Sequence, residues 1–222
     1  MNTAYSDIRA RVDAAAQGAG HPASLLAVSK TKPAPAIRAL AALGQRAFGE
    51  NYVQEALAKQ CELTDIGLEW HLIGPLQSNK CREVAQHFDW LQSLDREKLV
   101  EPLNRFRATG TQKPLNVLIQ VNIDAEASKS GCAPDAVPRL AEQIAAAPHL
   151  RLRGLMAIPE PATAEASRRA AFRRMSELFD ALRRDFPRAD TLSMGMSDDF
   201  ELAIAEGATM VRIGTALFGA RG

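Results

Sequence analysis

Cysteine is scarce in this sequence, and its three cysteines are not arranged in pairs. Cys61, Cys81 and Cys132 lie far apart, and none belongs to a CxxC motif. An odd number of isolated cysteines does not fit a disulfide framework and predicts reduced thiols, as in a cytoplasmic protein. The four histidines also lack the short spacings of zinc ligands, so we expect no metal site.

No excess of charge of either sign is present. The chain has 27 Lys and Arg against 26 Asp and Glu, a formal net charge of +1 at pH 7. This balance gives no electrostatic reason to expect binding to nucleic acid or to a membrane surface. The first residues, MNTAYSDIRARVDAAAQ, carry charges where a signal peptide is apolar, and no run reaches the roughly 18 apolar residues of a membrane-spanning helix. We therefore expect a cytoplasmic protein with neither a membrane nor a nucleic acid as a partner.

Linkers and dinucleotide-binding glycines are missing as well. No stretch rich in Pro, Gly and Ser divides the 222 residues and the composition does not shift along them, so residues 1–222 are predicted to form a single, monomeric domain. No GxGxxG motif follows the first apolar run, which weakens the alternative of an open, doubly wound sheet.

Short apolar runs alternate with helical patterns along the whole chain. Residues 170–186 place Phe172, Met175 and Leu182 on one face and arginines on the other, as in an amphipathic helix. Eight strands are expected at residues 24–29, 46–49, 69–73, 90–94, 115–122, 152–158, 190–194 and 209–214. Strands with intervening helices in this number predict an α/β fold, a (β/α)8 TIM-type barrel with parallel strands, preceded by an N-terminal helix.

Polar residues recur where these apolar runs end. In a barrel of this type the chemistry lies at the C-terminal ends of the strands, so such residues would converge on one rim. The strand ends hold Lys30, Glu50 with Asn51, His71 with Gly74, Ser93, Asn122, Met156, Ser193, and Arg212 with Gly214. Each is weak evidence alone, because strand ends usually meet solvent, but together they predict a pocket.

Two of these strand ends have a specific chemistry. Lys30 is either a solvated strand terminus or a lysine that forms a Schiff base. Gly214 and Thr215 follow the last strand and can present N–H groups and a hydroxyl to a phosphate, with Ser193 beside them. Ser197 is expected to be the N-cap of a helix. A reactive lysine and a phosphate cradle suit pyridoxal 5′-phosphate (PLP), which carries an aldehyde and a phosphate.

Several longer motifs resemble one known family. They are AVSKTKP, FGENYVQE, WHLIGPLQSNK, SKSG, RGLMAI, LSMGMSDD and VRIGTALFG, which occur in this order from about residue 24 to the C-terminus. This set resembles the pyridoxal phosphate homeostasis protein family. The resemblance implies a fold similar to the N-terminal barrel of alanine racemase. It also implies PLP binding without an established enzymatic activity, and a role in maintaining the balance of vitamin B6.

The resemblance also implies roles for individual residues. Lys30 matches the lysine that binds PLP covalently as an aldimine, and Asn51 matches an asparagine near the cofactor ring. Arg212 matches the arginine that faces the pyridine nitrogen. The phosphate ligands would be Ser193, Gly214 and Thr215, and the remaining pocket walls would be His71, Met156 and Met194.

Three functions are compatible with these residues. An arginine at the ring nitrogen can donate a hydrogen bond but does not keep that nitrogen protonated, which disfavours transaminase-like chemistry and leaves racemisation possible. The chain ends at FGARG soon after the last strand, so we expect no second domain to complete a racemase site. We favour a non-enzymatic protein of PLP homeostasis that delivers PLP to apo-enzymes. A weak PLP-dependent amino-acid racemase and a PLP-sensing regulatory protein are the alternatives.

Overall fold

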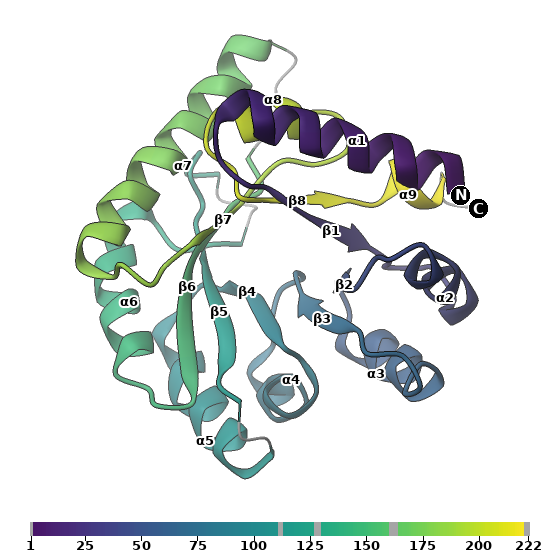
Figure 1. The fold of residues 1–222 in the computed structure, drawn as a ribbon. Coiled ribbons are helices and arrows are strands. Elements are labelled where there is room, and N and C mark those ends of the chain that lie inside the picture. Colours follow the sequence, from purple (N-terminus) through teal and green to yellow (C-terminus); the bar gives the residue numbers. More distant parts are fainter. Residues whose placement is uncertain (1, 111–112, 127–129, 160–163, 220–222) are drawn as a thin grey trace.

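Eight parallel strands form a closed barrel, as the sequence predicts. The computed structural model describes residues 2–110, 113–126, 130–159 and 164–219. Each strand pairs with the next one in the sequence, and β8 pairs with β1 to close the ring (Figure 1). The strands are β1 (Ser24–Val28), β2 (Ala47–Glu50), β3 (Glu69–Leu72), β4 (Trp90–Leu94), β5 (Leu115–Gln120), β6 (Leu150–Met156), β7 (Thr191–Ser193) and β8 (Met210–Ile213).

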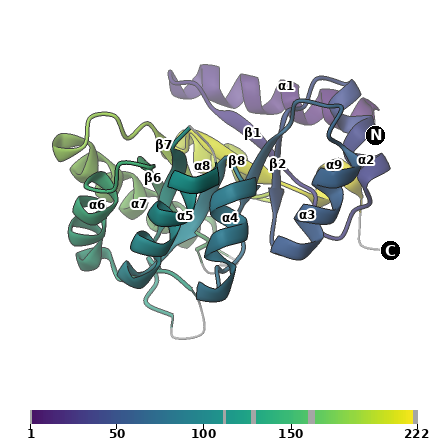
Figure 2. The ribbon, with the colours of Figure 1, turned by 90° about the horizontal axis from the view of Figure 1, so that it is seen from below.

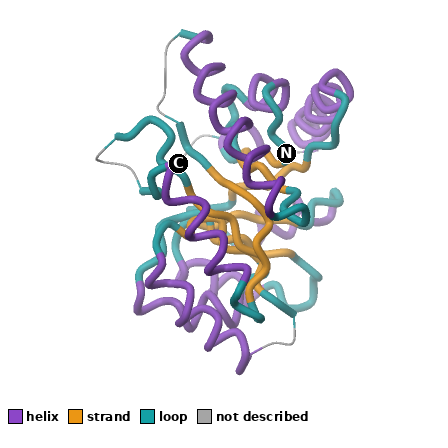
Figure 3. Tube along the Cα trace, turned by 90° about the vertical axis from the view of Figure 1, so that its left-hand side faces the viewer, coloured by secondary structure: helices purple, strands orange, loops and turns teal. Residues whose placement is uncertain are grey.

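Helices lie around the outside of the barrel (Figures 2 and 3). The α-helices are α1 (Asn2–Ala19), α2 (Ala34–Ala42), α3 (Val53–Glu62), α4 (Cys81–His87), α5 (Val100–Gly110), α6 (Val137–Ala145), α7 (Glu165–Asp185), α8 (Phe200–Ala205) and α9 (Thr215–Phe218). Single turns of 3-10 helix are η1 (Ser78–Lys80), η2 (Glu97–Leu99) and η3 (Pro134–Ala136). Within the described residues, no helix is both long enough and apolar enough to cross a membrane.

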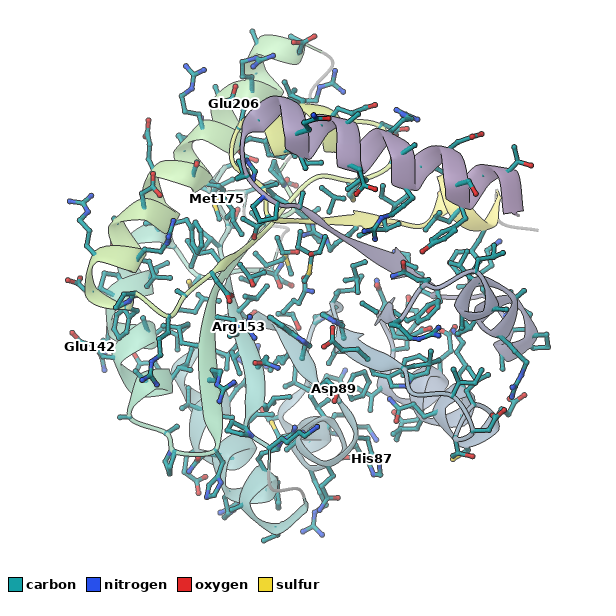
Figure 4. All side chains as sticks on the ribbon, viewed as in Figure 1. His87, Asp89, Glu142, Arg153, Met175 and Glu206 are labelled. Carbon is teal, nitrogen blue, oxygen red and sulfur yellow. The ribbon has the colours of Figure 1, made fainter. Side chains whose placement is uncertain are left out.

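The helices are amphipathic, and their apolar faces build the core. Met175 of α7 is fully buried and lies on the face turned to the strands, whereas the exposed Glu142 of α6 lies on the outer side (Figure 4). The N-terminal helix α1 packs against α8 and α9, and its Tyr5, Ile8 and Val12 belong to the core. Burial of this apolar surface is the main force that holds helices on the barrel.

Residues on each strand alternate between the helices and the barrel interior. On β8, Val211 and Ile213 belong to the large core shared with the helices, whereas Arg212 contacts a side chain of β7 inside the ring. A smaller apolar cluster of Trp90, Leu118 and Met156 lies apart from that core. The strands are buried on both faces, and their side chains point alternately to the helices and to the barrel interior. This alternation decides which polar side chains lie inside the barrel.

One end of the barrel interior is closed by Arg153 of β6. Its guanidinium lies 4.6 Å from the centre of the Trp90 ring and pairs with Asp190, which precedes β7. Asp190 lies before its strand, so this closure is at the N-terminal end. Any site that opens from the barrel interior must therefore lie at the C-terminal ends of the strands.

Candidate functional site

A cavity opens at the C-terminal ends of the strands. It has a volume of about 290 Å³ and is built from the ends of β1, β2, β3, β6, β7 and β8. Its lining consists of Val28, Lys30, Asn51, Ile73, Ile158, Met196, Ser197, Asp198, Arg212, Gly214 and Thr215. Ile158 and Met196 are among the large apolar side chains that are exposed, so the cavity mouth is apolar and open to solvent. This rim is where barrels of this type carry their chemistry.

A larger hollow of about 450 Å³ lies at the other end of the barrel. It is bounded by residues that precede β5, β6 and β7, among them Pro114, Pro148 and Pro187. No lysine, histidine, serine or cysteine of the described residues lines it. We therefore place the candidate site at the smaller cavity, which has the reactive groups.

Lys30 reaches this cavity because β1 ends two residues before it. Strand β1 pairs with β8 so that Leu26 lies opposite Arg212. It pairs with β2 on its other side, where Val28 lies opposite Gly49. The three strands thus bring Lys30, Asn51 and Arg212 to one cavity, although these residues are far apart in the sequence.

Arg212 is a buried cation on the cavity wall. It is 4% exposed, and it donates from Nη1 to Ser193 Oγ at 2.8 Å and from Nη2 to the Ala157 carbonyl at 2.8 Å. Burial lowers the pKa of Arg212 to about 10, although the carboxylate of Asp199 acts in the opposite direction. The guanidinium therefore stays charged at neutral pH and is fixed by two acceptors.

A chain of hydrogen bonds through the barrel interior orients Arg212. Ser193 Oγ accepts from Arg212 and donates to Gln92 Oε1 at 2.7 Å. The Gln92 amide donates to Nδ1 of His71 at 2.9 Å, and His71 Nε2 is 2.8 Å from Glu69 Oε1. These directions are consistent if His71 is neutral and carries its proton on Nε2. Burial lowers the pKa of His71, which favours this neutral form.

One wall of the cavity is formed by residues at and after the ends of β7 and β8, and β8 is the neighbour of β1. Gly195 has φ of 91°, a backbone conformation that favours glycine, and it turns the chain after β7 so that Met196, Ser197 and Asp198 reach the cavity. Helix α8 begins at Phe200 after Asp199, so the expectation that Ser197 caps this helix is wrong. Ser197 instead lines the cavity together with Thr215.

Replacing Gly195 by alanine is expected to destabilise the fold by about 2–4 kcal/mol, from left-handed strain and from overpacking. A Cβ at this position would lie 2.5 Å from the Cβ of Ala203, so the turn would have to shift. Urea unfolding measures the loss. Gly44→Ala is the matched control, because Gly44 has φ of 103° and no atom within 4 Å of the added Cβ. An equal loss in both variants would mean that the contact with Ala203 is unimportant.

The structure brings together five of the predicted site residues and places four elsewhere. Lys30, Asn51, Arg212, Gly214 and Thr215 all line the cavity. The four that do not line it are His71, Met156, Ser193 and Met194, and all four are fully buried.

Each of these four residues has another role in the barrel. The hydroxyl of Ser193 is held between Arg212 and Gln92, so it orients the arginine, and its role as a phosphate ligand stays a prediction. His71 stacks on Trp90 with ring centres 5.1 Å apart. Met156 belongs to the interior cluster with Trp90, and Met194 belongs to the outer core.

Several lining residues are not among those predicted from the sequence. Ile73, Ile158 and Met196 form apolar walls, and Ser197 offers a second hydroxyl. Gly195 is the feature of the sequence from which Ser197 could have been predicted. A glycine soon after a strand permits a turn that brings the following residues over the strand end.

Known proteins are similar to this chain over nearly its whole length. A family model described as alanine racemase, N-terminal domain, matches residues 4–222. A protein of Pseudomonas aeruginosa named pyridoxal phosphate homeostasis protein is 59% identical over 217 residues, which cover 96% of this chain and 93% of that protein. The protein of the same name from Escherichia coli K12 is 51% identical over 222 residues, covering 97% and 94% of the two chains.

A solved structure is similar over nearly its whole length. It is PipY of Synechococcus elongatus PCC7942 with PLP bound, which has 39% sequence identity and a TM-score of 0.85. The match covers 98% of this chain and 99% of PipY.

Proposed function

The chain belongs to the pyridoxal phosphate homeostasis protein family, which shares the alanine racemase N-terminal domain, and on that premise we propose that it binds PLP in the strand-end cavity as a carrier of the cofactor. The observation that carries the proposal is the meeting of Lys30, Arg212 and the hydroxyls of Ser197 and Thr215 in one cavity. In this proposal residues 1–222 act as one monomeric, cytoplasmic domain.

Lys30 supplies the amine for a Schiff base with the PLP aldehyde. The reaction needs a primary amine that reaches into a cavity with room for the cofactor. Lys30 lines a cavity of about 290 Å³, near the lower end of the range of roughly 300–1,000 Å³ for ligand pockets. The imine forms with loss of water and is reversed by water, so attachment at Lys30 can be undone.

The ring lies between apolar walls and faces Arg212. Val28, Ile73 and Ile158 provide apolar contacts for an aromatic ring, and Asn51 offers an amide beside them. Because Arg212 is buried and already holds two protein acceptors, its remaining N–H groups have a fixed direction. A guanidinium donates to the pyridine nitrogen without protonating it, so PLP here is a weak electron sink.

The phosphate is bound by small groups. Gly214, Thr215 and Ser197 line the cavity, and the first N–H groups of α9 have no partner within the helix. A Cβ on Gly214 would lie 3.2 Å from the Val28 carbonyl and 3.3 Å from the Val28 Cβ, so the missing side chain leaves space beside β1. Of the lining residues described, Lys30 and Arg212 are the cations, and Asp198 is a carboxylate. The phosphate therefore relies on neutral donors.

A PLP-dependent racemase is the competing proposal. Racemisation needs an acid–base group on each face of the substrate. Tyr52 follows Asn51 but is 61% exposed and does not line the cavity, so it is not placed to serve the second face. Incubation with a panel of L-amino acids followed by chiral chromatography decides between the two, since D-amino acid formed only with PLP present would favour the racemase.

Direct transfer of PLP is the result we expect from a carrier. A phosphate held by N–H and hydroxyl groups makes no bidentate ion pair with an arginine, so it should be released more readily than from a cradle that has one. The loaded protein, mixed with an apo PLP enzyme, should restore that enzyme's activity in the presence of a phosphatase that destroys free PLP. Activity is measured over time against the same total amount of free PLP.

In the control with free PLP alone, the phosphatase must abolish activation of the apo enzyme. If activation by the loaded protein is lost to the same extent, hand-over does not occur, and the protein acts only as a buffer of free PLP. A PLP-sensing regulator would instead bind a partner in one of its two states, which a pull-down with and without PLP detects.

A further inference from the structure

The backbone beside Lys30 has an unusual conformation. Thr31 has φ of 63°, in the left-handed region, and Ala125 is the other described non-glycine residue with positive φ. A β-branched residue is a genuine outlier there, and such conformations persist only where the surroundings enforce them. The surroundings of Thr31 should therefore contain the groups that hold it.

Those groups form a buried ionic cluster of Glu50, Glu55 and Lys59. The ammonium of Lys59 donates to Glu50 Oε1 at 2.7 Å and to Glu55 Oε1 at 2.6 Å. Its third hydrogen bond goes to the Ser29 carbonyl at 2.8 Å. The side chains of Lys59 and Glu50 are 7% and 0% exposed, so the lysine is a buried cation whose three protons are all used.

The cluster holds the residues on both sides of Lys30. The N–H of Thr31 donates to Glu55 Oε1 at 2.5 Å, and the Ser29 hydroxyl donates to Glu50 Oε1 at 2.6 Å. One ammonium thus ties the backbone before Lys30 directly and the backbone after it through Glu55. Glu50 also ends β2 and directly precedes Asn51 of the cavity wall.

Stability alone is a poor reason for this cluster. The free energy needed to remove two charges from water offsets much of the attraction within a buried ion pair. A protein in which apolar residues of similar volume replace the pair is often equally stable or more stable. Burial raises the pKa of Glu50, and no described residue donates to its Oε2. The contacts of the cluster are instead concentrated on the two neighbours of Lys30.

We propose that Lys59, with Glu50 and Glu55, is a positioning residue that fixes the left-handed turn at Thr31 and so aims Lys30 into the cavity. This inference rests on the proposed function, because its effect is on the reaction of Lys30 with PLP. The phosphate cradle at Ser197, Gly214 and Thr215 follows β7 and β8, and among the described residues no hydrogen bond of the cluster reaches it.

The experiment compares PLP with pyridoxine 5′-phosphate, which has the phosphate and the ring but no aldehyde. Lys59→Met is expected to weaken PLP binding and slow borohydride-trappable attachment about tenfold, the factor that corresponds to the strain of one left-handed residue. Binding of pyridoxine 5′-phosphate should change less than about twofold, because the cradle is intact.

Thr31→Gly provides the rescue. Glycine adopts positive φ without strain, so adding Thr31→Gly to Lys59→Met should recover most of the lost attachment rate. Lys59→Met leaves Glu50 buried without its cation, so the pair Glu50→Gln with Lys59→Met is made as a folded alternative with the same expected selectivity. Arg38→Met is the matched control, because it removes one positive charge from an exposed ion pair with Asp65.

The outcomes separate this inference from the proposed function. If the unaltered protein binds neither compound, the proposed function fails and this inference fails with it. If the unaltered protein binds both, a variant that loses both equally, or loses neither, overturns the positioning role alone. A selective loss of PLP attachment that Thr31→Gly rescues supports it.

Discussion

Lys30→Ala is expected to abolish covalent attachment of PLP. Lys30 is the lysine in the lining of the strand-end cavity, and the Schiff base cannot form without its amine. The unaltered protein with PLP should be yellow, and borohydride should fix the cofactor to the peptide that contains Lys30. In the variant the fixed cofactor should fall to background, while some binding through the phosphate remains. Absorption spectra and mass spectrometry of the reduced protein measure both.

Lys113→Ala is the matched control for this result. Lys113 is exposed and precedes β5, so it lies at the opposite end of the barrel from the cavity. This variant should keep the full label at Lys30. Cofactor fixed in equal amount after Lys30→Ala would mean that another lysine forms the Schiff base, and the assignment of Lys30 would be wrong.

Arg212→Glu is expected to raise the pH at which bound PLP changes its absorption. The guanidinium repels a proton on the ring and on the imine, whereas a carboxylate at the same place attracts it. A negative charge within about 4–6 Å raises the pKa of a group that becomes positively charged by roughly 1–3 units. The protonated form of bound PLP should therefore persist to higher pH. Titration of the absorption band at full occupancy measures the shift.

Two other variants make this result interpretable. Arg212→Glu removes the donors to Ser193 and Ala157, which costs about 3–5 kcal/mol of stability, so occupancy and thermal unfolding are checked first. Arg212→Gln keeps a donor without the charge and should give a smaller shift in the same direction. Arg153→Glu makes the same change of charge at the opposite end of the barrel and should give none. An unchanged titration in both Arg212 variants would show that Arg212 does not face the ring.

Much of the fold could be predicted from the sequence because its signals are local. Apolar runs predict the strands, which are three to seven residues long, and their alternation with amphipathic helices predicts the barrel. All eight expected strands are present, with ends that differ by about two residues, as expected where a strand frays into a loop. The strand order then follows, because consecutive parallel strands in such a fold lie side by side.

Lys30, Asn51, Arg212, Gly214 and Thr215 could be assigned to one cavity for the same reason. Each follows or ends an apolar run, and the parallel barrel brings all such ends to one rim. Nothing in the sequence, however, says how a loop continues beyond the rim. The turn at Gly195 brings Ser197 to the cavity lining, whereas the Ser193 hydroxyl bonds to Arg212 and Gln92, although both serines belong to the same motif.

The sequence by itself determined the barrel and the rim on which the reactive lysine lies, because strand periodicity and strand ends are properties of neighbouring residues. The tertiary structure alone decided which hydroxyl faces the cavity and which one holds Arg212. It also decided that Lys59, which the sequence places on the helix after β2, is the buried cation beside Lys30. These contacts join residues 9 to 101 positions apart, and their geometry depends on the closure of the whole barrel.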